Sequence, residues 1–461
     1  RIVKRNLSLS AYAQYYHDFN DAHQHHIDIM GGYEYQRFYR GTDNNYWGIY
    51  GAGNTKTGTY VDHYGKPLVD ANGNEITGSL AGQIYNPSMK AYKTENYLVS
   101  FFGRANWSFM DRYYLTATVR DDGSSRFKEH WAWFPSFAFA WKASEENKLK
   151  EISWLSDLKL RLGWGMTGQQ DVNNDYAWIP TYTRNQGTGA YYPADGDGTL
   201  NYTPDLKWET TTTYNIGLDW GILDQRLTGT VDWYYRKTTD LLNYAPTQAL
   251  SAFRNQAWQN IGTLSNTGVE VTLSWKAIQT KDWYGTIDYN FTYNRNRIDD
   301  LTGASSDGLP VPNTSIVIGT DKYLEYNAVG NPANSFWVYQ QAYDKNGKAI
   351  EGAMVDRNGD GKISPEDRYF YKSPTPPVTM GLSSRLEYKN WDLGFTLRAN
   401  IGNYVFDNIS QGFKNVSPNA LWASSNFMCN KTAQAVADDW QTDDVTSNLT
   451  DRWIHNASFL K

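Results

Sequence analysis

The chain has 461 residues, a formal net charge of −6 and a pI of about 5.7, and it lacks the basic stretches that typify nucleic-acid-binding proteins. Its mean hydropathy is −0.66, and no apolar run approaches the roughly 18 residues that a spanning helix needs, which excludes a helical membrane protein. The single cysteine, Cys429, excludes an internal disulfide and a cysteine-based metal site.

Residues alternate between apolar and polar in stretches of about ten. In the stretch 225–236 one face carries Leu227, Val231, Trp233 and Tyr235, and the other carries Thr228, Thr230, Asp232, Tyr234 and Arg236. A period of two places successive side chains on opposite sides of a β-strand. An apolar, aromatic face backed by a polar face is typical of a transmembrane β-barrel strand.

About twelve such stretches follow one another and predict an all-β, antiparallel transmembrane barrel. They cover roughly residues 5–16, 23–38, 95–108, 112–122, 132–143, 157–167, 208–220, 225–238, 266–277, 283–296, 378–388 and 391–401. On the polar face, Arg120, Asp232, Arg236, Asp288, Asn290 and Asn294 are predicted to face the lumen.

The connections between these stretches alternate in length. Short turns are expected near 17–22, 109–111, 221–224, 278–282 and 389–390, and long loops at about 39–94, 168–207, 239–265, 297–377 and 402–461. Outer-membrane barrels have short periplasmic turns and long extracellular loops. A soluble all-β sandwich is the alternative, but it has no reason to keep its long loops at one end.

Several strings resemble the SusC/RagA family of TonB-dependent outer-membrane transporters of Bacteroidetes-type bacteria. The most distinctive is NYLVSFFGRANWSFMDRYYLTATVRDDGSSRF from Asn96, which is followed by WAWFPSFAFAW. Further strings are LKLRLGWGMTGQQ from Leu158, LKWETTTTYNIGLDWGILDQRLTGTVDWYYRKTTDLL from Leu206, NIGTLSNTGVEVTLSW from Asn260 and the final TDRWIHNASFLK.

The resemblance implies a 22-stranded barrel, an N-terminal plug domain and coupling to the inner-membrane TonB–ExbB–ExbD complex. It also implies a SusD-like surface lipoprotein that acts as a lid, with a dimer of transporter–lipoprotein pairs as a compatible assembly. No stretch here resembles a plug, a signal sequence, or a first or last strand, so residues 1–461 are interpreted as the middle and late part of one barrel. The expected function is import of a nutrient across the Gram-negative outer membrane, a glycan in preference to a peptide.

Aromatic residues make up 16% of the chain, and many of them fall in the predicted long loops. Flat rings stack on sugar rings, and loops on a rigid scaffold often bind ligands. The candidates for substrate binding are Tyr46, Trp47, Trp178, Tyr182, Tyr191, Tyr192, Trp337 and Tyr339. In the alternative interpretation these side chains pack loop against loop, or against the lid.

One loop has the spacing of a calcium site. In DRNGDGKISPED, Asp356, Asn358 and Asp360 occupy positions 1, 3 and 5, and Asp367 occupies position 12. Lys362 at position 7 would offer its backbone carbonyl, and hard oxygen ligands at these spacings suit Ca²⁺. We expect a structural calcium ion here, with a Gly/Asp-rich surface turn that binds no metal as the alternative.

No other motif indicates a cofactor or catalysis. His23, His25 and His26 lie near a predicted turn, but His25 and His26 would face opposite sides of a strand, which disfavours a shared metal. No histidine lies in a recognisable catalytic string, so an enzyme and a redox cofactor are not expected. A passive porin and a surface glycan-binding adhesin are the alternatives to a transporter.

Overall fold

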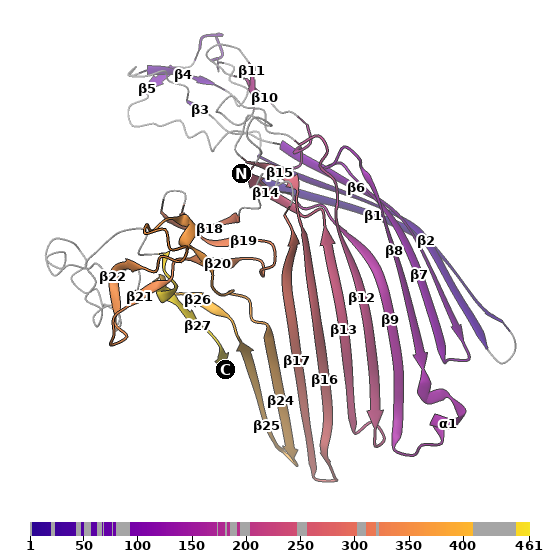
Figure 1. Ribbon diagram of the computed structural model, residues 1–461. Helices are drawn as coiled ribbons and strands as arrows, with labels where there is room; N and C mark the ends of the chain where they lie inside the picture. Colours follow the sequence, from indigo (N-terminus) through magenta and orange to yellow (C-terminus); the bar gives the residue numbers. More distant parts are fainter. Residues whose placement is uncertain are drawn as a thin grey trace.

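A computed structural model gives the architecture of the chain (Figure 1). It describes residues 2–19, 24–42, 48–49, 57–61, 67, 69–75, 77–79, 93–172, 174–179, 182–184, 191–193, 203–246, 256–301, 310–319, 322–408 and 449–461. Nearly all the regular structure in these ranges is β-strand. No described helix is long and apolar enough to cross a membrane.

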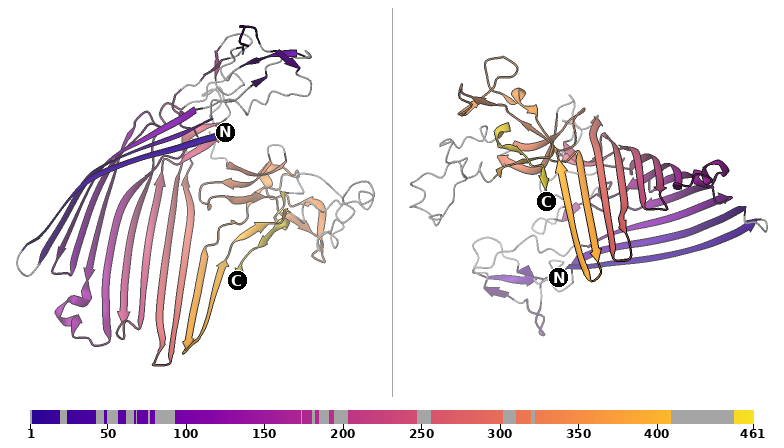
Figure 2. Two further views of the ribbon diagram at one scale, coloured as in Figure 1. Left: turned by 180° about the vertical axis from the view of Figure 1, so that it is seen from behind. Right: turned by 90° about the horizontal axis from the view of Figure 1, so that it is seen from below.

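Thirteen strands form one antiparallel sheet, in which each strand pairs with its neighbour in chain order. The strands are β1 (Ile2–Phe19), β2 (His25–Thr42), β6 (Lys93–Phe109), β7 (Tyr113–Ser124), β8 (Trp131–Lys142), β9 (Leu155–Gln169), β12 (Glu209–Ile222), β13 (Leu227–Thr239), β16 (Thr263–Gln279), β17 (Trp283–Asp300), β24 (Val378–Tyr388), β25 (Trp391–Ile401) and β28 (Phe459–Leu460). The sheet curves into an open wall whose edge strands, β1 and β28, do not pair with each other (Figure 2).

Twelve of these strands confirm the segments predicted from the alternation. The thirteenth, β28, corrects the expectation that residues 402–461 are loop throughout. Ala399 and Asn400 of β25 pair with Leu460 and Phe459. A strand of two residues is too short to show a period of two, so the alternation could not reveal β28.

An apolar band crosses the whole wall because the strand register keeps apolar residues opposite one another. Leu218 lies opposite Val231, Val231 opposite Val271, and Val271 opposite Phe291. The same row continues from Phe291 to Met380. The side chains are well exposed, with Val231 at 40% and Ile216 at 48%. A register shift of one residue would move this face to the other side of the sheet, so an environment that favours apolar side chains on one face fixes the register.

The connections alternate in length as predicted. Tight hairpins join β6 to β7, β12 to β13, β16 to β17 and β24 to β25 at the lower end in Figure 1, where the short helix α1 (Asn147–Lys150) also lies. At the tightest turns, Met110, Asp111 and Lys389 have positive φ, as hairpin turns with the twist of the strands require. All the long connections leave from the opposite end.

The long connections carry smaller sheets. These are β3 (Gly48–Ile49) with β4 (Thr57–Val61) and β5 (Thr77–Ser79), β10 (Tyr182–Arg184) with β11 (Tyr191–Pro193), and β14 (Leu242–Pro246) with β15 (Gln256–Asn260). Another group comprises β18 (Val311–Gly319), β19 (Lys322–Asn327), β20 (Ser335–Val338) and β23 (Tyr369–Phe370). Two further pairs are β21 (Gln341–Tyr343) with β22 (Ala349–Met354), and β26 (Tyr404–Phe406) with β27 (Ile454–Asn456).

Candidate functional site

The last two long connections fold together into one unit, which we call the loop body (residues 322–372, 404–406 and 449–456). Its core contains Leu324, Phe336, Val338, Tyr339, Leu449 and Ile454, all at most 6% exposed. Backbone hydrogen bonds join the two connections, because Tyr339 N donates to Leu449 O and Asp451 N donates to Tyr339 O. Segments separated by more than 100 residues therefore share one core at the end of the sheet from which the long connections leave.

Arg368 lies at the centre of the loop body. Its guanidinium carbon is 3.8 Å from the centroid of the Trp337 ring and 4.9 Å from that of Tyr326. The guanidinium donates to the backbone carbonyls of Trp337 and Tyr323. Burial lowers the pKa of Arg368 from its usual value, but an arginine pKa is so high that the group stays charged.

The neighbours of Arg368 extend this junction in both directions. Tyr369 donates its hydroxyl to Asp451 Oδ2 at 2.7 Å, and burial together with this bond raises the pKa of Tyr369. On the other side, Asp367 is fully buried and closes the 356–367 loop. Asp367, Arg368 and Tyr369 thus link the 356–367 loop, the sheet that contains β19, β20 and β23, and the 449–456 segment.

The 356–367 loop is held by carboxylates that accept backbone N–H groups. Asp367 Oδ2 accepts from Ser364 N at 2.8 Å, and its Oδ1 accepts from Arg357 N at 2.8 Å. These bonds, the one from Ser364 N first, lower the pKa of Asp367. Asp356 accepts from Gly359 N and Gly361 N, both at 2.7 Å. Both glycines have positive φ, which suits the sharp turns of the loop.

Asp360 Oδ1 accepts from Lys362 N, and Asn358 Oδ1 accepts from Asp360 N. Among the described residues, no three His, Cys, Asp or Glu side chains converge as a metal-holding group. A carboxylate has about four lone-pair sites, so each oxygen that accepts one N–H keeps capacity for a cation. The loop supplies oxygen ligands of the type that calcium prefers, but these oxygens would have to move closer to one another to coordinate an ion.

The aromatic candidates have different environments. Tyr339 is 6% exposed and belongs to the core of the loop body, so its ring offers almost no surface to a solute. Trp337 lies between Arg368 and the ring of Phe370, whose centroid is 6.3 Å away. Trp178 donates its indole N–H to Ser125 O and packs on a second core, formed by Phe127, Phe134, Val172, Ala177, Leu206 and Trp208. Trp178 and Tyr339 pack loop against loop, which was the alternative interpretation, whereas the contacts of Trp337 lie within its own connection.

The remaining aromatic candidates are less informative. Tyr182 lies in β10, and Tyr191 and Tyr192 lie in β11, where Thr183 pairs with Tyr192. Tyr46, Trp47 and Cys429 fall outside the described residues. At the short-turn end, His26 pairs with Asp18 whereas His25 packs against Phe109, so the two histidines face opposite sides as predicted.

On the polar face, arginines bridge three strands at a time. Arg161 of β9 bonds Asp219 of β12 at 2.7 Å and reaches Asp232 of β13 at 3.0 Å. Gly217 of β12 lies between Arg161 and Asp232 in the register, and a Cβ there would collide with both side chains.

Arg120 of β7 likewise reaches Glu34 of β2 at 2.8 Å over the buried Ser100 of β6, to which it also donates. The predicted lumen residues Arg120 and Asp232 thus belong to cross-strand ion pairs.

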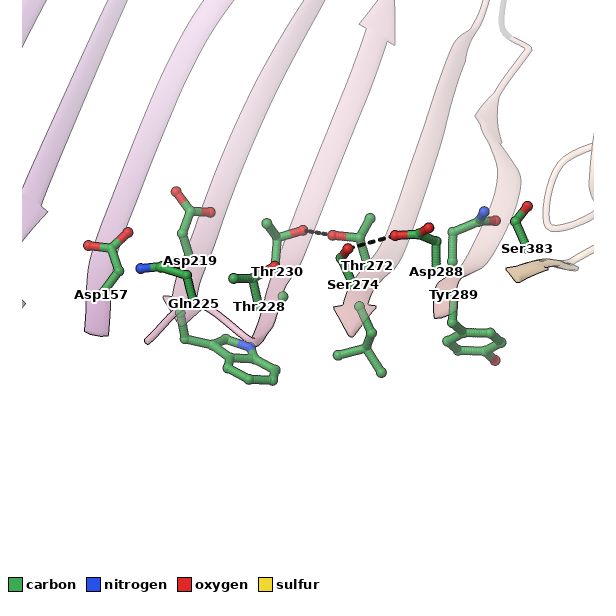
Figure 3. Close-up of a pocket in the computed structure, with 14 residues that line it drawn as sticks. Asp157, Asp219, Gln225, Thr228, Thr230, Thr272, Ser274, Asp288, Tyr289 and Ser383 are labelled. Atoms are coloured by element: carbon green, nitrogen blue, oxygen red, sulfur yellow. Dashed lines mark hydrogen bonds between the residues drawn. The ribbon is translucent and has the colours of Figure 1, made fainter. Parts of the chain in front are cut away.

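A hollow of about 380 Å³ lies on the same face near the short-turn end. Its polar lining is Asp157, Asp219, Gln225, Thr228, Thr230, Thr272, Ser274, Asp288, Asn290 and Ser383. In Figure 3 the labelled carboxylates and hydroxyls project from one side of the sheet, whereas the Tyr289 ring points to the other side. Thr230 pairs with Thr272 at 2.7 Å, and Ser274 donates to Asp288 at 2.6 Å.

Sequence reasoning missed Arg368, Arg161 and this hollow. The alternation placed Asp288 and Asn290 on the lumen face, but it gave no register between strands and so could not show which residues meet. For Arg368 the signal available was its place directly after Asp367, within an aromatic-rich stretch.

Comparison with known proteins decides the family. Residues 3–404 match the family model described as "TonB dependent receptor-like, beta-barrel". The chain belongs to the TonB-dependent receptor β-barrel family. It is therefore part of an outer-membrane protein, whose polar face is the lumen side and whose apolar band faces lipid.

Individual relatives agree with this membership. The chain is 43% identical to "TonB-dependent receptor SusC" of Bacteroides thetaiotaomicron over 99% of its own length, and it spans 43% of that receptor. It is 28% identical to "TonB-dependent receptor P3" of Formosa agariphila, over 95% of this chain and 43% of the relative. These matches confirm the resemblance to the SusC/RagA family, and the names are those of receptors, not enzymes.

Among solved structures, the RagAB peptide importer in its closed-closed state has the same fold. It superposes with a TM-score of 0.72 at 24% identity, over 100% of this chain and 48% of that chain. The chain thus spans less than half the length of the relatives it matches.

Proposed function

We propose that the complete protein imports a nutrient across the outer membrane, energised through TonB and the ExbB–ExbD complex, with a SusD-like lipoprotein as its lid. The observation that carries the proposal is the continuous two-faced wall in a chain that is 43% identical to a TonB-dependent receptor along almost its whole length. A porin or an adhesin would need the same wall, but the family match favours a coupled receptor over both.

We further propose a glycan as the favoured nutrient and a peptide as the second candidate. The RagAB structures to which the fold is similar are described as a peptide transporter and importer, which supports the peptide. The glycan is supported by the many loop aromatics, although Trp178 and Tyr339 now have packing roles. Trp337, Tyr182, Tyr191 and Tyr192 stay candidates for contact with substrate.

Growth and co-purification test this proposal. A strain that lacks the gene should lose growth on one class of oligosaccharide or peptide as sole carbon source, and the intact gene should restore it. Removal of TonB should abolish the restored growth. Purification from solubilised outer membranes should bring down a surface lipoprotein in equal amount. Growth that is independent of TonB would indicate a porin, and unchanged growth on every nutrient would indicate an adhesin.

For the 356–367 loop we propose a structural calcium ion held by Asp356, Asn358, Asp360, the Lys362 carbonyl and Asp367. The support is the ligand spacing together with glycine turns that bring the carboxylates onto one short loop. Two other turns of the chain provide controls, because Asp70 and Asp344 also accept backbone N–H groups in D-x-N-G sequences that have no acid at the twelfth position.

Calcium should protect the 356–367 segment of the full-length protein from proteolysis, and a chelator should remove the protection. The substitution Asp360→Asn should remove the response to calcium, whereas Asp344→Asn should leave it. Identical cleavage with calcium and with chelator would mean that the loop is a metal-free turn.

A further inference from the structure

Three cations lie on the lipid-facing side of the wall, near the end from which the long connections leave. Arg295 and Arg297 of β17 lie four and six residues beyond Phe291, which belongs to the apolar band. Lys237 of β13 lies six residues beyond Val231, which belongs to the same band. A period of two keeps alternate residues on one face, so all three side chains point to the lipid side. All three residues are exposed.

These cations are grouped around one strand, because β16 lies between β13 and β17 (Figure 1). Lys237 and Arg297 both lie opposite Ser265 of β16, and Arg295 lies opposite Thr267. Neighbouring strands are about 4.8 Å apart, so the backbones of Lys237 and Arg297 are about 10 Å apart. Lysine and arginine side chains are long enough to reach one small ligand over Ser265.

The position of the cluster along the strands gives its depth in the membrane. On β16, Trp275 near the hairpin and Ser265 face the same side and are ten residues apart. Ten residues extend about 33 Å along a strand, and a tilt of about 40° reduces this to about 25 Å, the height of the lipid-facing band. Tyr235 and Tyr293 each precede a cation by two positions on the same face, as in the aromatic girdle at a membrane surface. The cations therefore lie at the level of the lipid headgroups.

Little of the described chain neutralises this cluster. Arg297 Nε lies 3.8 Å from Asp299 Oδ1, whereas Lys237 and Arg295 form no salt bridge with the described residues. Like charges this close repel one another, and an anion that binds between them relieves the repulsion. Arg37 of β2 also points to the lipid side but is already bonded to Glu95 at 2.9 Å. The cluster around Ser265 therefore lacks an anion that the protein supplies to Arg37.

The long connections of outer-membrane barrels are extracellular, so the headgroups at this level are those of the outer leaflet. That leaflet consists largely of lipopolysaccharide, whose lipid A anchor carries phosphate. Guanidinium groups match phosphate oxygens in geometry as well as in charge.

We propose that Lys237, Arg295 and Arg297 bind a phosphate group of lipid A on the outer surface of the barrel. The two arginines bond the phosphate oxygens, Lys237 adds a third positive charge, and the acyl chains lie along the apolar band below. The choice of lipid A rests on charge complementarity and on the leaflet that the cluster faces. The inference requires only that the chain is part of an outer-membrane barrel, and it is independent of any imported nutrient.

Native mass spectrometry of the full-length protein tests the inference. The protein is extracted from outer membranes in mild detergent with EDTA, which removes lipopolysaccharide held only through divalent cations. The wild type should retain lipid A-containing molecules through size-exclusion chromatography. Lys237→Gln combined with Arg295→Gln should lower the retained amount per barrel about tenfold or more, because each cation near an anionic lipid contributes to binding. Heat-modifiable migration on gels shows that the variant still forms a barrel.

Arg236→Gln combined with Arg37→Gln is the matched control, because it also removes two positive charges. Arg236 is the neighbour of Lys237 in β13 but points to the lumen side, and Arg37 is bonded to Glu95. This control should retain the wild-type amount of lipid A. Equal retention by the wild type and the Lys237/Arg295 variant would overturn the inference.

Adding lipids back to the delipidated protein identifies the group that is recognised. Purified lipid A should bind, whereas chemically dephosphorylated lipid A and phosphatidylglycerol should each bind about tenfold more weakly or less. The phosphodiester of phosphatidylglycerol carries one charge, whereas a phosphomonoester carries nearly two at neutral pH. Equal binding of dephosphorylated lipid A would overturn the role of phosphate, and equal binding of phosphatidylglycerol would overturn the assignment to lipid A.

Discussion

Arg161 of β9 and Asp232 of β13 form an ion pair across the strand that separates them, with 3.0 Å between Nη2 and Oδ2. Gly217 of β12 makes this possible, because a side chain at that position would occupy the space through which the two groups meet. We predict that Gly217→Ala breaks the contact and lowers the stability of the folded barrel by about 1–2 kcal/mol. Unfolding of the full-length protein in denaturant measures the change.

A double-mutant cycle provides the control for this ion pair. Asp232→Asn should cost about 1 kcal/mol in the presence of Gly217 and much less in the Gly217→Ala background, because the contact is then already lost. Equal costs in both backgrounds would show that Gly217 has no role in the pair.

Arg368 should be the most sensitive position in the loop body. Arg368→Met removes the bonds to the carbonyls of Trp337 and Tyr323 and leaves these acceptors without the guanidinium. We expect a loss of about 2–4 kcal/mol in local stability. Proteolysis within residues 322–372 should accelerate while the barrel stays heat-modifiable. Arg357→Met, which removes a more exposed arginine above Tyr369, is the comparison and should have a smaller effect.

Acidification should loosen the 356–367 loop. The pKa of Asp367 is lower in the folded protein than in the unfolded chain, so the carboxylate stabilises the fold above its unfolded pKa of about 3.9. That contribution is lost as the pH falls through the lower, folded pKa. Hydrogen exchange of this segment, corrected for the intrinsic effect of pH, should stay slow at neutral pH and accelerate below about pH 4.

The substitution Asp367→Asn is the control for the pH experiment. Exchange should then be faster at neutral pH and should lose its dependence on acid. A pH profile that is the same in the wild type and in this variant would show that another group controls the loop.

The two faces of the sheet should differ in how much an introduced charge costs. Val231→Arg places a guanidinium in the apolar band and should cost about 2–4 kcal/mol for folding into a bilayer. Thr292→Arg, on the lumen face of β17, should cost far less because that face is polar. Folding yields in lipid vesicles measure both. Similar losses for the two variants would contradict the assignment of the faces.

The strands of the wall could be predicted well from the sequence because the alternation of apolar and polar residues within each strand reflects the environments of its two faces. Val231 and Trp233 alternate with Thr230 and Asp232 within a single stretch, and lipid on one side is sufficient to maintain that pattern. The segments at 378–388 and 391–401 match β24 and β25 in the structure.

The loop body and the hollow could not be predicted in the same way. Tyr339 meets Leu449 across more than 100 residues, and such a contact leaves no local period in the sequence. The hollow depends on the register of six strands, which the alternation within each strand does not encode. Trp178 and Tyr339 were predicted to bind substrate because they are aromatic residues in long loops. In the structure, packing between distant loops covers them.

The separation of tight hairpins and long connections at opposite ends has an evolutionary consequence. Strand pairing is set by hairpins of a few residues at one end, so insertions at the other end leave the wall unchanged. Such a scaffold tolerates recombination and rapid divergence of its outward-facing segments. Related proteins can thereby evolve different ligand preferences while they keep the same membrane-inserted sheet.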